Sequence, residues 1–151
     1  MALSLGQSAP HFSLPSTSGT DFSFEKIANK ACVLYFYPKD FTPGCSKEAC
    51  DFRDHFDLFK NLDIDVFGIS TDSLSTHLKF KNKYQLPFEL LSDVEGKVSK
   101  LYKARIPILN LSKRVSYLLD KNHTIVAIYE NMFGAEKHIR MMLEKINGQN
   151  H

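Results

Sequence analysis

The stretch from Ala31 to Leu62, "ACVLYFYPKDFTPGCSKEACDFRDHFDLFKNL", changes its hydrophobic period once, and this change decides the fold. Ala31–Tyr37 is a continuous apolar, β-rich run, which is typical of a strand buried on both faces. Pro38 ends this run. From Pro43 to about Leu62, apolar residues recur at steps of three and four, and this predicts an amphipathic helix. The recurring residues are Ala49, Phe52, Phe56 and Phe59.

The flanking sequence continues the alternation of strands and helices. Near the start, "FSLPSTSGTDFSF" predicts two short strands around a Ser/Thr/Gly turn. Near the end, two strands around the polar turn "KNH" predict a β-hairpin, followed by a helix with Gly148 as its C-cap. The expected elements after Leu62 are strand Ile64–Ser70, helix Ser73–Gln85 with Leu74, Leu78 and Lys81 or Tyr84 along it, strand Phe88–Ser92, helix Glu95–Ala104, strands Val115–Asp120 and Thr124–Glu130, and helix Ala135–Gly148.

This order predicts an α/β fold with a mixed sheet. Parallel βαβ units followed by an antiparallel ββα end describe a mixed sheet with helices on both faces. A thioredoxin-like domain has this order, here with an N-terminal β-hairpin extension. The chain has 151 residues, which is enough for one domain with its own core, so we expect a single domain over residues 1–151.

Composition and charge exclude several classes of function. The net charge is +2 and the basic residues are scattered, which is not the clustered footprint of a nucleic-acid-binding protein. The longest apolar runs are far too short to span a bilayer. The start "MALSLGQSAPHFSL" has neither the basic region nor the apolar region of a secretory signal. We therefore expect a cytoplasmic protein with no nucleic-acid or membrane partner.

Three cysteines and dispersed histidines argue against a disulfide framework and against a metal centre. An odd and small number of cysteines in a reducing compartment indicates buried thiols, ligands or catalytic groups. The Cys-x4-Cys pair lacks the second pair that a structural zinc site needs, so we expect no metal. Cys32 lies early in a predicted buried strand, where a thiol is most often a small apolar core residue.

Cys45 stands at the predicted start of the Phe-rich helix. Thr42 is a good N-cap and Pro43 is favoured at the first helical position, which makes Cys45 the third residue of the helix. Unpaired N–H groups and the positive end of the helix dipole favour a thiolate there. Gly44 is expected to leave open space beside the sulfur. A passive cysteine in a capped first turn is the alternative.

Cys50 follows five residues later and makes the reactive interpretation stronger. In an intact helix the two Cα atoms are about 8.7 Å apart and the side chains point in different directions. A disulfide needs Cα atoms within about 7 Å, so the pair can bond only if the first turns unwind. Gly44 and Ser46 are weak helix formers and lower the cost of unwinding. The alternative is a small core residue beside Ala49.

The segment "YPKDFTPGCSKEACDFRD" resembles the active-site segment of the peroxiredoxins, in particular of the bacterioferritin-comigratory-protein or PrxQ-type subfamily. The family pattern Pro-x-x-x-Thr-x-x-Cys is met by Pro38, Thr42 and Cys45, and a second cysteine five residues on, here Cys50, marks the subfamily. The resemblance extends over "GQSAPHFSLPSTSG", "VFGISTD", "FELLSDVEGKVSKLY" and "RVSYLLDKNHTI".

The resemblance implies a thiol peroxidase that needs no cofactor. Cys45 would be the peroxidatic cysteine, which a hydroperoxide oxidises to a sulfenic acid, and Cys50 would resolve it as an intramolecular disulfide. Thr42 would hold the peroxide and Pro38 would shield the sulfenic acid. A thioredoxin-type protein would then reduce the disulfide. No metal, haem or flavin is required.

The resemblance also implies an arginine beside the sulfur, and Arg114, which leads into the hairpin strand, matches its position. An exposed charge at a strand start is the alternative for Arg114. Glu48 is expected either to orient that arginine or to lie on the helix surface. Arg53 is expected either to join the site or to pair with a nearby acid.

Other functions and surfaces stay open at this point. A general thiol–disulfide oxidoreductase would use a Cys-x-x-Cys pair instead of the Cys-x4-Cys seen here. A non-catalytic redox-sensing or binding module would not need an anion-stabilising pocket around a thiol. The apolar segment 104–112 is expected to form a lid, a substrate-facing surface or a subunit contact. We expect a monomer or a weak homodimer.

Overall fold

A five-stranded mixed sheet forms the centre of the molecule, which we describe from a computed structural model over residues 2–130 and 135–149. The strands lie in the order β5-β4-β3-β6-β7. β4 pairs in parallel with β3 and β5, whereas β6 is antiparallel to β3 and β7. The bounds are β3 Ala31–Phe36, β4 Ile64–Ser70, β5 Glu89–Ser92, β6 Val115–Leu119 and β7 Ile125–Glu130.

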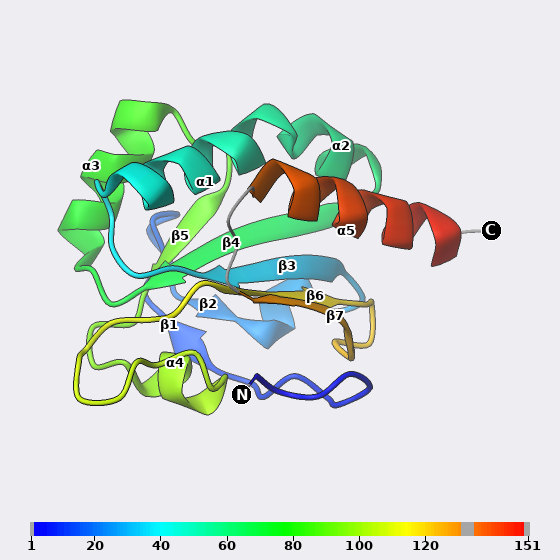
Figure 1. Cartoon of the computed structure of the whole chain (residues 1–151), viewed down its shortest axis with the longest axis horizontal. Coiled ribbons are helices and arrows are strands. Elements are labelled where there is room, and N and C mark those ends of the chain that lie inside the picture. The colour runs from blue at the N-terminus through cyan, green and yellow to red at the C-terminus, as the bar shows by residue number, and fades with distance from the viewer. Residues whose placement is uncertain (1, 131–134, 150–151) are drawn as a thin grey trace.

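Helices and the N-terminal segment cover the two faces of this sheet (Figure 1). One face carries α1, α2, α3 and α5, and the other carries α4, the 3-10 helix η1 and the small hairpin of β1 and β2. The predicted mixed α/β fold with an N-terminal hairpin is therefore confirmed. The bounds are β1 Ser13–Leu14, β2 Phe22–Ser23, η1 Phe24–Ile27, α1 Pro43–Asp54, α2 Phe56–Asn61, α3 Leu74–Tyr84, α4 Lys97–Leu101 and α5 Ala135–Gln149.

The continuous apolar run of β3 supplies both halves of the core. Successive strand residues point to opposite faces, so Val33 and Tyr35 pack under α1, while Cys32 and Leu34 pack under the N-terminal segment. Cys32 is completely buried, and burial raises the pKa of its thiol far above the ordinary value. The structure thus places Cys32 as a core residue.

The single helix predicted from Pro43 to about Leu62 is two helices. α1 ends at Asp54 and α2 begins at Phe56, with His55 between them at φ −104° and ψ 5°. Both the backbone N of His55 and its ring Nδ1 lie within hydrogen-bond distance of the Asp51 carbonyl, at 3.2 and 2.9 Å. The break in the helix thus coincides with two contacts to one carbonyl oxygen. The predicted row of Phe side chains continues on both sides of the break, with Phe52 and Phe59 completely buried.

Three helix details differ from the sequence prediction. α3 buries His77 and Phe80, whereas Leu78 is 46% exposed, so its inner face is rotated from the one that the leucines indicated. α4 is shorter than predicted and begins after Gly96, which adopts a left-handed conformation at φ 72°. α5 continues to Gln149, so Gly148 lies inside the helix and is not its C-cap.

Candidate active site

The loop after β3 and the first turn of α1 carry three of the predicted site residues. Thr42 is the N-cap of α1 with extended backbone angles, and Pro43 is the first helical residue, as predicted. The Ser46 N–H donates to the Thr42 carbonyl at 2.8 Å, which closes the first turn. Cys45 is the third helical residue and is only 1% exposed. Its sulfur therefore lies at the positive end of α1.

The Thr42 hydroxyl does not cap the helix. It donates to the Lys39 carbonyl at 2.9 Å, and no side-chain bond to the first helical N–H groups is formed. With its proton committed to that carbonyl, the oxygen presents its lone pairs as an acceptor. A hydroxyl oxygen fixed in this way can accept a hydrogen bond from the O–H of a hydroperoxide.

Arg114 reaches the sulfur of Cys45 from the other side of the site. Its Nη2 donates to Cys45 Sγ at 3.1 Å, and its Nη1 donates to Glu48 Oε1 at 3.1 Å. The sheet explains this approach, because β6 pairs with β3 so that Val115 faces Phe36. Arg114, one residue before β6, is thereby delivered to the edge where β3 ends and the active-site loop begins. The guanidinium is always charged, so this contact places a positive charge beside the Cys45 sulfur.

Gly44 has a different role from the one that the sequence indicated. A Cβ atom at this position would lie 2.7 Å from Arg114 Nη2 and 3.5 Å from its Cζ. The space beside the helix start is thus filled by the guanidinium and is not open. Gly44 permits the close approach of Arg114 to the first turn of α1.

Glu48 is a buried partner of Arg114, with its side chain 3% exposed. Its Oε1 accepts from Arg114, while its Oε2 has no hydrogen-bond partner among the described residues. Burial raises the pKa of Glu48 to about 8, and the neighbouring guanidinium lowers it only in part. A neutral Glu48 still accepts through its carbonyl oxygen and leaves the charge of Arg114 directed at the sulfur.

Cys50 lies on the same helix as Cys45, and both thiols are free. α1 is continuous through both residues, so the expected Cα separation of about 8.7 Å applies and excludes a bond in this state. Cys50 is half-buried, whereas Cys45 is buried. Cys32 packs on the opposite face of the sheet from Cys45, which removes it as a partner for that sulfur.

Arg53 lies away from this site. Its Nη1 donates to the Tyr84 carbonyl at 2.8 Å and its Nε to Asp54 Oδ1 at 3.1 Å, so it joins α1 to the end of α3. Of the two alternatives expected for Arg53, the structure shows the pairing with a nearby acid, Asp54. Of the two expected for Glu48, it shows the contact with Arg114.

The apolar segment 104–112 forms a loop with a tied base and an exposed tip. Arg105 and Ser112 form an antiparallel bridge, and the Thr71 hydroxyl donates to the Asn110 carbonyl at 2.7 Å. Ile108 is fully exposed at the tip, with φ 75°. This loop leads directly to Arg114.

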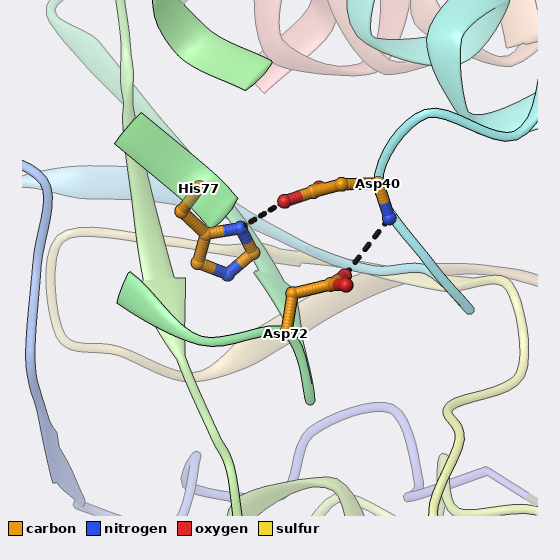
Figure 2. A group of neighbouring side chains, drawn as sticks. All are labelled: Asp40, Asp72 and His77. Carbon is orange, nitrogen blue, oxygen red and sulfur yellow. Dashed lines mark hydrogen bonds and ion pairs between the residues drawn. The ribbon is translucent and has the colours of Figure 1, made fainter. Parts of the chain in front are cut away.

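The sequence analysis missed two residues, Asp40 in the active-site loop and His77 in α3. They form a buried pair with His77 Nδ1 2.6 Å from Asp40 Oδ2, and Asp72 lies next to them (Figure 2). Within the described ranges, these three residues are the group of His, Cys, Asp and Glu side chains whose ligand atoms come within 4.8 Å of one another. The sequence did hold a signal that His77 is buried: His77, Phe80 and Tyr84 recur at steps of three and four, as residues on one face of a helix do.

Among the residues that the structure describes, no helix is both long and apolar enough to cross a bilayer.

The chain is similar to known proteins in sequence and in fold. The model of the AhpC/TSA family matches residues 5–128. Peroxiredoxin Q, chloroplastic, of Oryza sativa subsp. japonica is 45% identical over 138 residues, which is 91% of this chain and 64% of that protein. The chain thus spans slightly less than two thirds of the length of this relative.

Two solved structures match along almost their whole lengths. Peroxidoxin BcpB from Mycobacterium tuberculosis is 30% identical with a TM-score of 0.88, over 95% of this chain and 96% of that one. A cysteine-to-serine mutant of PrxQ from Xylella fastidiosa is 26% identical with a TM-score of 0.90, over 100% and 99% of the two chains. Peroxiredoxin Q, chloroplastic, of Sedum lineare is 44% identical over 135 residues, which is 89% of this chain and 73% of that protein. With the Cys45 motif at the start of α1 and the family match over residues 5–128, the chain belongs to the AhpC/TSA family and is a peroxiredoxin of the PrxQ type.

Proposed function

We propose that this chain is a thiol peroxidase that reduces hydrogen peroxide and organic hydroperoxides through Cys45. The observation that carries the proposal is the 3.1 Å contact from Arg114 Nη2 to Cys45 Sγ at the first turn of α1. Two sources of positive charge, the guanidinium and the helix start, meet at one buried sulfur. A passive core cysteine does not require either.

The first step oxidises the sulfur and breaks the peroxide bond. The Cys45 thiolate attacks one peroxide oxygen, an S–O bond forms and the O–O bond breaks, so the sulfur is oxidised to a sulfenic acid. The leaving oxygen is reduced and departs as water or an alcohol after taking up a proton. Thr42 accepts from the peroxide O–H, Arg114 stabilises charge on the oxygens, and Pro38 shields the product.

The second step joins Cys45 to Cys50. The Cys50 thiol attacks the sulfenic sulfur, water leaves, and an intramolecular disulfide forms. Since both cysteines belong to α1, the helix must first open between its start and Cys50. The contact of Ser46 N with the Thr42 carbonyl is among the first that opening would break. A thioredoxin-type dithiol then reduces the disulfide by exchange.

The two alternative functions fit this site less well. A general disulfide exchanger needs a pair that closes without rearrangement, and α1 holds the two sulfurs apart. A non-catalytic binding module has no use for a buried thiol beside a guanidinium. We also propose that residues 1–151 form one thioredoxin-like domain, that the protein acts in the cytoplasm, and that it is a monomer or a weak homodimer.

Peroxide consumption coupled to thioredoxin, thioredoxin reductase and NADPH tests the proposal. Wild type is expected to turn over, and Cys45→Ser is expected to lose all turnover. Cys50→Ser is expected to reduce one equivalent of peroxide and then stop. Normal turnover by Cys45→Ser would overturn the proposed function, and a normal cycle in Cys50→Ser would move the resolving role to another thiol. Insulin reduction, measured in parallel, distinguishes a general exchanger.

A further inference from the structure

Asp40 lies in the middle of the loop that joins β3 to α1, between Pro38 and Thr42, and its side chain is completely buried. Its backbone N–H donates to Asp72 Oδ2 at 2.8 Å. Its Oδ1 accepts from the Tyr37 hydroxyl at 2.5 Å, and its Oδ2 lies 2.6 Å from His77 Nδ1. Three polar groups of one loop residue are thus held at once, and none of the partners belongs to α1.

The far side of the network is attached to the sheet and to α3. Ser70 Oγ, at the end of β4, donates to Asp72 Oδ2 at 2.5 Å, and Ser92 Oγ, at the end of β5, donates to the Asp72 carbonyl at 2.6 Å. His77 comes from the buried face of α3. The loop is therefore tied to β4, β5 and α3 together.

The partners of His77 determine where its protons lie. Nε2 is 2.9 Å from the Leu91 carbonyl, which can only accept, so Nε2 carries a hydrogen. The contact of Nδ1 with Asp40 Oδ2 is a hydrogen bond, which places a second hydrogen between these two atoms. A fully buried hydrogen bond between groups that can bear opposite charges is short and strong, and this one is the shortest that His77 makes.

A metal ion does not account for this geometry. Two ligands of one zinc ion, each about 2.0–2.2 Å from it in a tetrahedral site, lie about 3.3 Å apart. The 2.6 Å between His77 Nδ1 and Asp40 Oδ2 is a hydrogen-bond distance instead. Asp72 Oδ2 is also occupied by two donors.

The next residue shows why the loop needs such an anchor. Phe41 has φ 65°, a left-handed conformation that is unfavourable for a bulky side chain. It turns the chain from Asp40 into the N-cap Thr42. Strained conformations persist only where the surroundings over-determine them, and here Asp40 is held on one side while the Thr42 hydroxyl binds back to Lys39 on the other.

We propose that His77 is a positioning residue for the peroxidase reaction. It holds the side chain of Asp40 while Asp72 holds the backbone N–H of the same residue, and together they clamp the Pro38–Thr42 loop in the geometry that binds the peroxide. The inference rests on the proposed function. Because the clamp has no partner in α1, Thr42 stays in place while the first turns of that helix open and close. The Pro38–Thr42 loop, which binds the peroxide, thereby keeps its conformation through each redox cycle.

The test separates peroxide binding from thiol reactivity in His77→Gln. Rapid-quench mass spectrometry measures the rate of Cys45 oxidation by hydrogen peroxide, and peptide mapping measures the rate of Cys45 alkylation by iodoacetamide. Alkylation needs the sulfur but not the peroxide-binding loop. We expect peroxide oxidation to fall at least tenfold and alkylation to change less than twofold. Equal loss in both rates, or a peroxide rate within twofold of wild type, would overturn the clamp.

His123→Gln is the matched control. His123 Nε2 lies 2.8 Å from the Ile27 carbonyl, and its ring packs on Phe24, whose side chain belongs to the core on the other face of the sheet. The same replacement at this site is expected to leave both rates unchanged. If His77→Gln does not fold, Asp40→Asn, which keeps the shape of the side chain, carries the same comparison.

A spectroscopic readout on the wild-type protein does not depend on whether a variant folds. The buried hydrogen bond between His77 and Asp40 predicts a strongly downfield, slowly exchanging resonance in the wild-type proton NMR spectrum, which His123→Gln is expected to keep. A wild-type spectrum without it would overturn the clamp. Wild type that consumes no peroxide would refute the proposed function itself, whereas an active wild type with an unaffected His77→Gln refutes the clamp alone.

Discussion

Arg114 and Cys45 are 69 residues apart in the chain, yet Nη2 of the arginine donates to Sγ of the cysteine at 3.1 Å. The antiparallel pairing of β6 with β3 creates this contact by bringing Val115 opposite Phe36. The contact is partly buried against α1, and the same guanidinium also binds Glu48. It is the centre of the proposed site, and most of the predictions below test its parts.

Arg114→Lys keeps a positive charge but loses the planar fork that binds Cys45 and Glu48 together. We expect the rate of Cys45 oxidation to fall by about 10²-fold, which is typical for the loss of one preorganised donor. Stopped-flow competition for peroxide measures it. Arg53→Lys is the control, since Arg53 binds Tyr84 and Asp54 instead. A rate within threefold of wild type in Arg114→Lys would contradict the assignment.

Gly44→Ala adds one methyl group where Arg114 Nη2 now lies, 2.7 Å from the new Cβ. The guanidinium is the end of a flexible side chain and can move, and alanine is the better helix former by about 1 kcal/mol. We therefore expect the free energy of unfolding to change by less than about 1 kcal/mol, while Cys45 oxidation slows at least tenfold. Urea denaturation and peroxide kinetics measure the two effects.

Ser46→Ala, on the same turn of α1, is the control for this change. It introduces the same residue type by removing a hydroxyl and adds no atom, and it is expected to keep the wild-type rate of Cys45 oxidation, the step that precedes opening of the helix. If Gly44→Ala also kept wild-type kinetics, the close approach of Arg114 would have no part in the reaction.

Because Glu48 is buried, we expect the free energy of unfolding to depend on pH. Burial raises its pKa to about 8 from an ordinary value of 4.5, so between these values the native protein holds a proton that the unfolded chain has lost. Stability from this group is therefore present at low pH and decreases as the pH rises toward 8, by roughly 1 kcal/mol per unit. Glu48→Gln is expected to flatten this decrease between pH 5 and 8, as measured by urea denaturation.

Glu95→Gln serves as the comparison for Glu48. Glu95 is exposed and paired with Lys97, and that pairing lowers its pKa, so its replacement leaves the slope between pH 5 and 8 unchanged. The same slope in wild type and Glu48→Gln would show that Glu48 is not the group responsible.

Formation of the Cys45–Cys50 disulfide is expected to open the first turns of α1. Amide hydrogen exchange should therefore be faster in the oxidised protein over residues 43–51, where the helix must unwind. Residues 74–84 of α3 are the internal reference and should keep their protection. Identical exchange over residues 43–51 in the reduced and oxidised proteins would rule out the opening.

The order of elements and the helix start were predictable because they depend on local patterns. The apolar run of β3, the change of period at Pro43 and the Thr42-Pro43 helix start follow from backbone preferences that act over a few residues. The break at His55 was not predictable from period, because the row of Phe side chains continues across it. The leucines expected along α3 do not mark its buried side, since Leu78 is exposed and Leu74 half-buried while His77 is buried.

Local patterns along the chain are enough to predict the fold class, the place of Cys45 in the first turn of a helix, and a Cys50 too distant to bond while that helix is intact. Three features follow only from the packed fold: the guanidinium of Arg114 fills the space beside Gly44, Glu48 is buried, and His77 meets Asp40. All three have one cause. These contacts join segments that are distant in the chain, and strand pairing and core packing, which bring them together, are not encoded in any local pattern.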